Sequence, residues 1–322
     1  MKKVLITGAV GFIGYHLSKT ILSLEGFNVI GIDNMDNYYD VKLKKDRLKI
    51  LKENNNFKFF KVDIINKNKI SNLFKKYKFT YVIHLAAQAG VRYSIENPEK
   101  YLQTNINGFF NIINMCKEKK IKHFLYASTS SVYGNNSNFP LNEDQPITKP
   151  LSFYAATKIS NEVIAHSFSN IYKLRSTGLR FFTVYGPFGR PDMALFKFTN
   201  SIVNGEPISL FNHGNHIRDF TYVDDVVESI IRLINKPPTS KIPHEVYNIG
   251  SSNPKELREY VSEIEVSTGK KSKIKKMGLQ AGDVFKTYAD TKKIYKKIRY
   301  KPKYDIKYGI SKFVYWFKNY YK

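Results

Sequence analysis

Hydrophobic and polar residues follow two alternating patterns along the first 180 residues of the chain. Short apolar runs bounded by polar residues are typical of buried strands, and longer segments between them have helical spacing of their apolar residues. We therefore predict strands at 4–7, 28–33, 57–62, 81–85, 123–127 and 176–180, and helices at 16–24, 70–77, 101–119 and 154–172.

The order of these elements predicts an α/β fold. Strands that alternate with helices at this spacing are parallel and joined by helical crossovers, which gives a doubly wound parallel sheet. After Pro187 the pattern loosens, and Gly, Pro and Asn separate shorter elements. We expect a sheet domain over 1–186 and a smaller C-terminal lobe over 187–322, with some later segments returning to the sheet domain. Helical spacing over 310–317 predicts a last helix that docks against the core.

The composition indicates a folded protein. Of 322 residues, 42% are hydrophobic and 15% aromatic, which excludes disorder of the whole chain. No apolar run approaches the length of about 18 residues needed to span a membrane, and the first residues do not resemble a signal peptide. A single cysteine, Cys116, excludes an internal disulfide and a cysteine-based zinc site. We expect a cytoplasmic protein without membrane insertion.

The charge is strongly basic, with 52 Lys and Arg against 27 Asp and Glu and a formal net charge of +25. Nucleic-acid binding would also need a recognition motif or a concentrated patch. The lysines are spread over most of the chain instead, and no such motif is found. We expect a solvated basic surface and no nucleic-acid partner, with steering of a polyanionic ligand at low salt.

Three glycines, Gly8, Gly11 and Gly14, lie between the first predicted strand and the first helix. They allow a tight turn, close approach of a pyrophosphate and close packing of helix on sheet, and the helix N-terminus offers free N–H groups to phosphates. Asp33 ends the second strand, where a carboxylate can accept both hydroxyls of an adenosine ribose and repels a 2′-phosphate. The motif predicts a Rossmann domain that binds NAD rather than NADP.

Tyr154 and Lys158 lie one helical turn apart on the same face of a predicted helix. A neighbouring ammonium and a positive nicotinamide ring both favour the phenolate form of a tyrosine, which makes it a better base at neutral pH. A hydroxyl cluster over 128–131 follows the fifth strand, at the end where open α/β sheets bind ligands. A surface pair and a Ser/Thr-rich turn are the alternatives, and the position after the glycine motif favours a catalytic site.

The glycine spacing and the Tyr154/Lys158 pair resemble the extended branch of the short-chain dehydrogenase/reductase superfamily. The resemblance implies that Thr129 is the third catalytic residue and that Lys158 also holds the nicotinamide ribose. It implies a cofactor site made of Gly8, Gly11, Phe12, Ile13, Gly14, Asp33, Asn34, Asp63, Ile64, Leu85, Ala86, Ala87, Gln88, Asn105, Ser128, Tyr154, Lys158 and Phe182.

The two residues after Thr129 distinguish related activities. Related nucleotide-sugar 4,6-dehydratases carry Asp-Glu in this segment, and related uronic acid decarboxylases carry a Glu. This chain has Ser130 and Ser131. Because it lacks these carboxylates, we expect a simple cycle in which a hydride leaves the sugar and returns to it.

Beyond the sheet, the chain resembles UDP-sugar epimerases along nearly its full length, most of all UDP-glucuronate 4-epimerases. The segments 88–94 and 180–193 carry this resemblance. It implies that Thr183 and Arg190 recognise the uronate carboxylate, and arginine forks suit such groups. The implied substrate site is made of Arg92, Thr129, Ser130, Thr183, Arg190, Leu210, Phe211, Arg218, Gln280 and Asp283. Each arginine could instead be a surface residue.

The hypothesis is therefore an NAD-dependent C4 epimerisation of UDP-glucuronate to UDP-galacturonate through a 4-keto intermediate. The alternatives are a 4-epimerase of a neutral UDP-hexose or UDP-N-acetylhexosamine, and a catalytically silent NAD-sensing protein. The resemblance also implies a homodimer formed through the predicted helices at 101–119 and 154–172. No metal site is expected, because structural or surface roles account for His84, His213 and His216.

Overall fold

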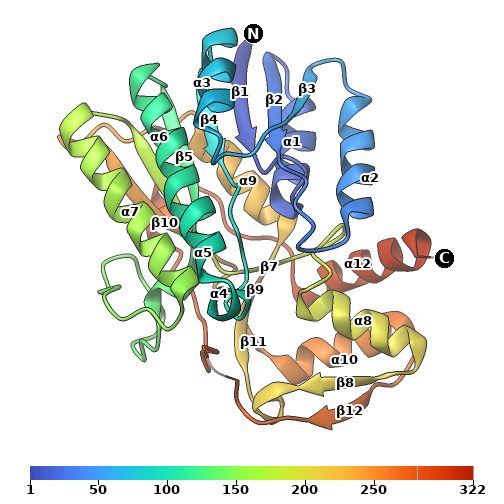
Figure 1. The fold of residues 1–322 in the computed structure, drawn as a ribbon. Helices are drawn as coiled ribbons and strands as arrows, with labels where there is room; N and C mark the ends of the chain where they lie inside the picture. The colour runs from blue at the N-terminus through green and yellow to red at the C-terminus, as the bar shows by residue number, and fades with distance from the viewer. Residues whose placement is uncertain (281, 322) are drawn as a thin grey trace.

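A seven-stranded parallel sheet is the centre of the computed structural model, which describes residues 1–280 and 282–321 (Figure 1). Every pair of neighbouring strands is parallel. The chain passes outward from β1 to β3 and then crosses back to place β4 on the other side of β1. In sheet order the strands are β10 (His244–Ile249), β6 (Ser176–Phe181), β5 (His123–Thr129), β4 (Tyr81–His84), β1 (Lys2–Thr7), β2 (Phe27–Asp33) and β3 (Phe57–Lys61).

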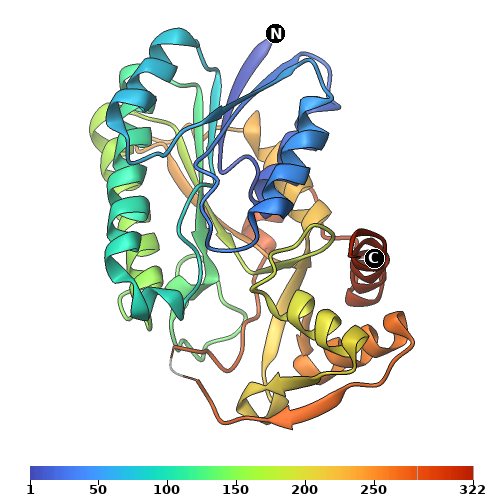
Figure 2. The same cartoon turned by 45° about the vertical axis from the view of Figure 1, so that its right-hand side comes forward.

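Helices cover both faces of this sheet, as Figures 1 and 2 show. Each face has its own apolar core, because β1, β4, β5 and β6 are buried on both sides. One core contains side chains of α1 (Phe12–Leu22), α2 (Val41–Lys52), α9 (Val223–Ile234) and α11 (Lys292–Ile298). The other contains side chains of α3 (Lys67–Lys76), α6 (Phe109–Glu118) and α7 (Phe153–Tyr172). The predicted doubly wound sheet is confirmed.

The helix predicted over 101–119 differs from the structure in one respect. It begins earlier, as α5 (Pro98–Tyr101), and passes through a π-helical turn, η1 (Leu102–Gly108), before α6. The Asn161 side chain donates to the backbone carbonyl of Asn105 at 2.7 Å. A side chain bound to a helix carbonyl in this way displaces the regular ladder, which accounts for the wider turn.

A smaller lobe lies beyond the carboxyl ends of the strands (Figure 2). Its helices α8, α10 and α12 pack around a third apolar core that includes Ile310, Phe313, Val314 and Phe317, so the predicted docking of the last helix is confirmed. None of the described helices is long and apolar enough to span a membrane. The lobe contains β7 (Thr183–Tyr185), β8 (Pro207–Leu210), β9 (Ile217–Tyr222), β11 (Pro254–Glu256), β12 (Lys273–Lys276), α8 (Ala194–Asn204), α10 (Leu257–Thr268) and α12 (Ile306–Tyr320).

The second half of the chain contributes to both parts. The strand β10 and the helices α9 and α11 belong to the large sheet and its core, although all three follow residue 187. The boundary after residue 186 stays a prediction.

Candidate active site

A cavity of about 1160 Å³ lies between the carboxyl ends of the strands and the smaller lobe. It begins at the turn after β1, next to the point where the strand order reverses between β1 and β4. Open α/β sheets bind ligands at such a reversal, because the loops on its two sides diverge and leave a crevice. The cavity then continues past the ends of β5 and β6 to β8 and β9 of the lobe.

The glycine turn at one end of the cavity is tightly built. Gly8 has a φ of +68°, and a Cβ on Gly14 would come within 2.0 Å of the Gly8 carbonyl oxygen. Larger residues at these positions would therefore push α1 away from β1. Among the described residues, no side chain caps the N-terminus of α1, so its first N–H groups are available to a phosphate. This arrangement fits a dinucleotide.

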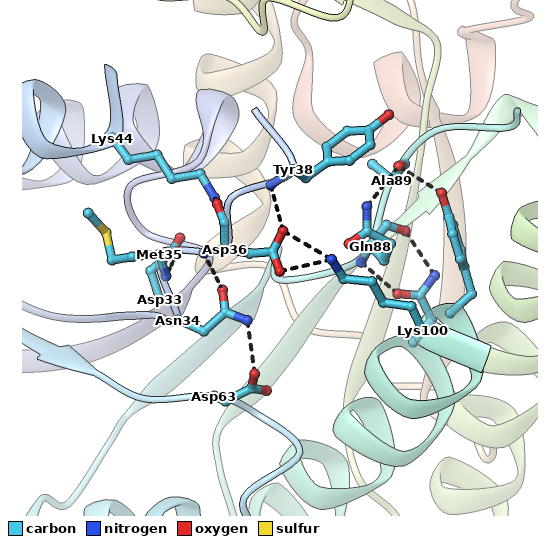
Figure 3. A network of polar contacts seen from close by, with 12 residues as sticks. Asp33, Asn34, Met35, Asp36, Tyr38, Lys44, Asp63, Gln88, Ala89 and Lys100 are labelled. Carbon is cyan, nitrogen blue, oxygen red and sulfur yellow. Dashed lines mark hydrogen bonds and ion pairs between the residues drawn. The ribbon is translucent and has the colours of Figure 1, made fainter. Parts of the chain in front are cut away.

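Asp33 lies buried at the end of β2, beside the glycine turn (Figure 3). One of its carboxylate oxygens accepts from the Met35 N–H at 2.8 Å. Burial raises the pKa of this carboxyl, and the Lys44 charge opposes that shift. The Asn34 amide donates to Asp63 at 2.9 Å, which joins the loop after β2 to the loop after β3. The donor and acceptor set fits an adenosine ribose.

The predicted catalytic pair lies in the first turns of α7, whose N-cap Ser152 accepts from the Ala155 N–H at 3.1 Å. Tyr154 is partly buried and lines the cavity, and Lys158 lies one turn further along. Burial raises the pKa of the Tyr154 phenol, while its hydrogen bond with Thr129 and the Arg190 charge lower it. The protein environment alone therefore raises this pKa, contrary to the lowering that the sequence suggests for the pair.

Lys158 is buried, with 2% of its surface exposed. Its ammonium donates to the Ala127 carbonyl at 3.0 Å, and burial lowers its pKa to about 8, with Glu162 acting in the opposite direction. Glu162 accepts from the Ser128 hydroxyl at 2.5 Å and from Arg180 at 2.8 and 3.0 Å. The buried ion pair with Arg180 thus ties α7 to β6, and the Ser128 hydrogen bond ties it to the end of β5.

The hydroxyl cluster after β5 faces the same cavity. The Thr129 hydroxyl donates to Ser131 Oγ at 3.1 Å, and the Ser131 N–H donates to Thr129 Oγ1 at 3.2 Å. Thr129, Ser130 and Ser131 all line the cavity. The side chains that directly follow Thr129 are thus hydroxyls, which can offer hydrogen bonds to a sugar.

Arg190 lines the cavity and forms a bidentate ion pair with Asp192. Its Nε donates to Asp192 at 3.0 Å, and its Nη2 donates to the other oxygen of the same carboxylate at 2.5 Å. Tyr38 also donates to Asp192 at 3.2 Å. An arginine has five N–H donors, so this pairing orients Arg190 and leaves donors for a ligand.

Further cations line the far end of the cavity. Arg92 donates to Asp283 at 3.2 Å and lies 5.0 Å above the Phe211 ring. Arg218 donates to the Phe285 carbonyl at 2.9 Å, and burial lowers its pKa to about 10, with Asp283 opposing. Cations beside an aromatic ring suit a ligand that has both phosphates and a planar base.

Comparison with known proteins decides the family. Residues 4–250 match the family described as "NAD dependent epimerase/dehydratase family". The chain belongs to this family.

Its relatives cover it from end to end. Protein CapI of Staphylococcus aureus is 49% identical over an alignment of 334 positions that covers 99% of this chain and 99% of the relative. A probable UDP-glucuronate 4-epimerase of Rhizobium meliloti is 41% identical, covering 99% of this chain and 98% of the relative. The crystal structure of UDP-glucuronic acid 4-epimerase from Bacillus cereus, in complex with UDP-glucuronic acid and NAD, matches with a TM-score of 0.93 at 33% identity, covering 99% of this chain and 100% of that one.

For this member of the NAD dependent epimerase/dehydratase family, the predicted family and NAD as cofactor are confirmed. The structure also gathers most of the predicted site residues around one cavity, although their roles stay predictions. Lining it are Gly8, Gly11, Phe12, Ile13, Gly14, Asp33, Asn34, Asp63, Ile64, Leu85, Ala86, Ala87, Gln88, Arg92, Ser128, Thr129, Ser130, Tyr154, Lys158, Phe182, Thr183, Arg190, Phe211, Arg218 and Asp283.

Three predicted residues of the epimerase/dehydratase do not line the cavity. Asn105 is buried behind it, where its side chain accepts from the Gln88 N–H at 2.8 Å and donates to the Gln88 carbonyl at 3.0 Å. These contacts position the loop after β4. Leu210 is buried in the lobe core. The side-chain oxygen of Gln280 is buried and, within the described part of the chain, has no hydrogen-bond partner.

Several polar residues that the sequence did not single out also line the cavity, among them Asp36, Tyr38, Lys44 and Lys100. Lys44 is buried, and its ammonium donates to the Asp36 carbonyl at 2.7 Å. The signal for it was weak, because Lys44 is one of several lysines in the α2 segment. Within the described ranges, no group of three or more His, Cys, Asp or Glu side chains could hold a metal ion.

Proposed function

We propose that this enzyme interconverts UDP-glucuronate and UDP-galacturonate by inverting the configuration at C4 of the sugar. The observation that carries this choice is the place of Arg190, which lines the same cavity as Tyr154 and whose charge lowers the pKa of the phenol. In a uronic acid the carboxylate is attached to C5, next to the reacting C4. A guanidinium close to the catalytic phenol is therefore where a uronate would present its carboxylate.

The residues of the chain divide the chemistry among them. Tyr154 takes the proton of the C4 hydroxyl, and Thr129, which shares a hydrogen bond with the phenol, orients the same oxygen. NAD, when bound, accepts the C4 hydride and returns it. Lys158 holds the nicotinamide ribose and favours the phenolate form of Tyr154 through its charge. The 4-keto sugar rotates in the cavity, so that the hydride returns to the opposite face of C4.

Absence of an acid beside Thr129 supports an epimerase rather than a dehydratase. Elimination of water from the sugar needs an acid and a base in addition to the tyrosine. The side chains that follow Thr129 on the cavity wall are the hydroxyls of Ser130 and Ser131. These hydroxyls cannot supply the acid that expels a hydroxyl group from the keto sugar, and return of the hydride is the step that remains.

The deciding experiment supplies the purified enzyme with UDP-glucuronate, UDP-glucose and UDP-N-acetylglucosamine in separate reactions, and resolves the C4 epimers by NMR. We expect a new C4 epimer only from UDP-glucuronate. Turnover of a neutral sugar without turnover of UDP-glucuronate would contradict the proposal.

Arg190→Met removes the guanidinium while keeping a side chain of similar length. Because a charged hydrogen bond contributes about 2 to 3 kcal/mol, we expect kcat/KM for UDP-glucuronate to fall about 50-fold or more. Arg232→Met is the matched control, since it breaks an exposed pair with Glu228 outside the cavity. Equal effects of the two variants would refute a role of Arg190 in recognising the carboxylate.

We further infer that two copies pair through α6 and α7. The two helices lie side by side at one edge of the sheet domain (Figure 1). Their outer surface exposes large apolar side chains, which a second copy would cover. They are Phe110, Val163, Ile171 and Tyr172, with 47%, 62%, 62% and 51% of their surfaces exposed.

The cytoplasmic location stays a prediction.

Val163→Glu places a charge on this apolar surface. We expect the variant to sediment as a monomer at micromolar concentration, because an unpaired carboxylate would be buried in the contact. Val266→Glu on α10, where the valine is 71% exposed, is the control and should leave the dimer intact. A dimeric Val163→Glu protein would exclude this surface.

A further inference from the structure

An ion pair joins two segments that line the cavity, Asp36 on one and Lys100 on the other. The Lys100 ammonium on α5 lies 3.0 Å from one carboxylate oxygen of Asp36 and 3.3 Å from the other (Figure 3). Asp36 belongs to the loop after β2, and Lys100 belongs to the segment after β4. Since β1 lies between β2 and β4 in the sheet, the ion pair connects the loops on the two sides of the crevice at the end of β1.

The Asp36 side of this contact is held in place by its own loop. The carboxylate also accepts from the Tyr38 N–H at 2.8 Å, and the Asp36 N–H donates to the Asn34 side chain at 3.0 Å. The Lys44 ammonium donates to the Asp36 carbonyl at 2.7 Å. Figure 3 shows Asp36 at the centre of these contacts with Lys100 reaching toward it. The carboxylate is thus preorganised, and the pair needs to order only the lysine.

A second contact crosses the same crevice. The Tyr38 ring lies 4.9 Å from the Tyr93 ring of α4 (Tyr93–Glu96), centroid to centroid. Gly90 allows this approach, because a Cβ there would lie 2.6 Å from the Tyr38 hydroxyl oxygen. Tyr38, Gly90 and Tyr93 line the cavity together with Asp36 and Lys100. Two independent contacts therefore close the same stretch of the crevice.

We propose that Asp36 and Lys100 form a clasp over the pyrophosphate of the bound NAD and are positioning residues that retain the cofactor. This inference rests on the placement of the dinucleotide along the glycine turn. Retention matters for the proposed cycle, since the cofactor is reduced and reoxidised in one turnover. Loss of the reduced cofactor between these steps would strand the keto sugar.

The test measures release of NAD from the holoenzyme with no sugar nucleotide present. Released NAD⁺ is trapped by excess alcohol dehydrogenase and ethanol, and the NADH formed gives the dissociation rate. A partly exposed ion pair is worth at most about fivefold in an equilibrium constant, so we expect Asp36→Asn and Lys100→Met each to release NAD about three- to fivefold faster. The exchanged pair, Asp36→Lys with Lys100→Asp, should return the rate to within about twofold of the original.

The control is Lys297→Met. It breaks a pair with Glu245 that has the same 3.0 Å separation and similar exposure but does not line the cavity. Unchanged release in both Asp36→Asn and Lys100→Met would overturn the clasp. So would fast release in Lys100→Met alone, which would mean that the ammonium binds the pyrophosphate without Asp36. Because no sugar is used, failure of the enzyme to act on UDP-glucuronate leaves this result unaffected.

Discussion

Tyr154→Phe is expected to lower kcat for C4 epimerisation by about a thousandfold, the middle of the range for loss of a general acid–base. The phenol oxygen is the group that takes and returns the C4 hydroxyl proton, and phenylalanine keeps the ring without it. The ring lies 6.1 Å from the Tyr101 ring in an edge-on contact that does not need the hydroxyl. The fold and the affinity for UDP-glucuronate should therefore change little.

The measurement is single-turnover reduction of bound NAD, followed at 340 nm after addition of UDP-glucuronate. Tyr172→Phe at the other end of α7 is the control, because its hydroxyl lies far from the cavity lining. Normal hydride transfer in Tyr154→Phe would show that another group removes the proton. A variant that no longer binds UDP-glucuronate would show that the phenol acts in binding instead.

The fold was predictable because its signals are local. Each buried strand is a short apolar run, and the glycine turn and Asp33 fix where the first two strands end. The three predicted residues that do not line the cavity, Asn105, Leu210 and Gln280, were all carried over from a resemblance. Which way such a side chain points depends on tertiary packing, which the periodicity of the sequence does not report.

Contacts between distant segments were outside the reach of the sequence. The hydrogen bond between Tyr38 and Asp192 joins residues 154 positions apart, and the ion pair between Asp36 and Lys100 joins residues 64 positions apart. Neither contact produces a periodic pattern in the sequence from which it could be predicted. The pKa values show the same limit. The spacing of Tyr154 and Lys158 suggests that the lysine ammonium sets the pKa of the phenol. Burial is instead the largest cause of the pKa shift at both residues, and burial depends on the whole fold.

Lys158→Met is expected to abolish most activity and yet stabilise the NAD-free protein. Burial lowers the lysine pKa from 10.5 to about 8, so the folded state disfavours the ammonium by about 3 kcal/mol at pH 7. Methionine removes that cost. It also leaves the Ala127 carbonyl without its donor, which costs about 1 kcal/mol. The free energy of unfolding should therefore rise by about 2 kcal/mol.

The stability difference between Lys158→Met and the wild type should depend on pH, which distinguishes relief of a buried charge from a change in packing. Between the folded pKa of about 8 and the unfolded value of 10.5, the unfolded chain binds more protons at Lys158 than the folded chain does, so the wild-type protein gains stability as pH rises. The variant has no such group. Urea unfolding of both proteins at pH 7 and pH 10 should show the advantage of Lys158→Met shrinking, because all other titrating groups are shared and cancel in the difference. Two outcomes would contradict the prediction: a gain in the free energy of unfolding that is equal at the two pH values, or a variant less stable than the wild type at pH 7. Either would mean that the buried lysine is uncharged in the folded protein. Tyr154 would then work without an ammonium one helical turn away.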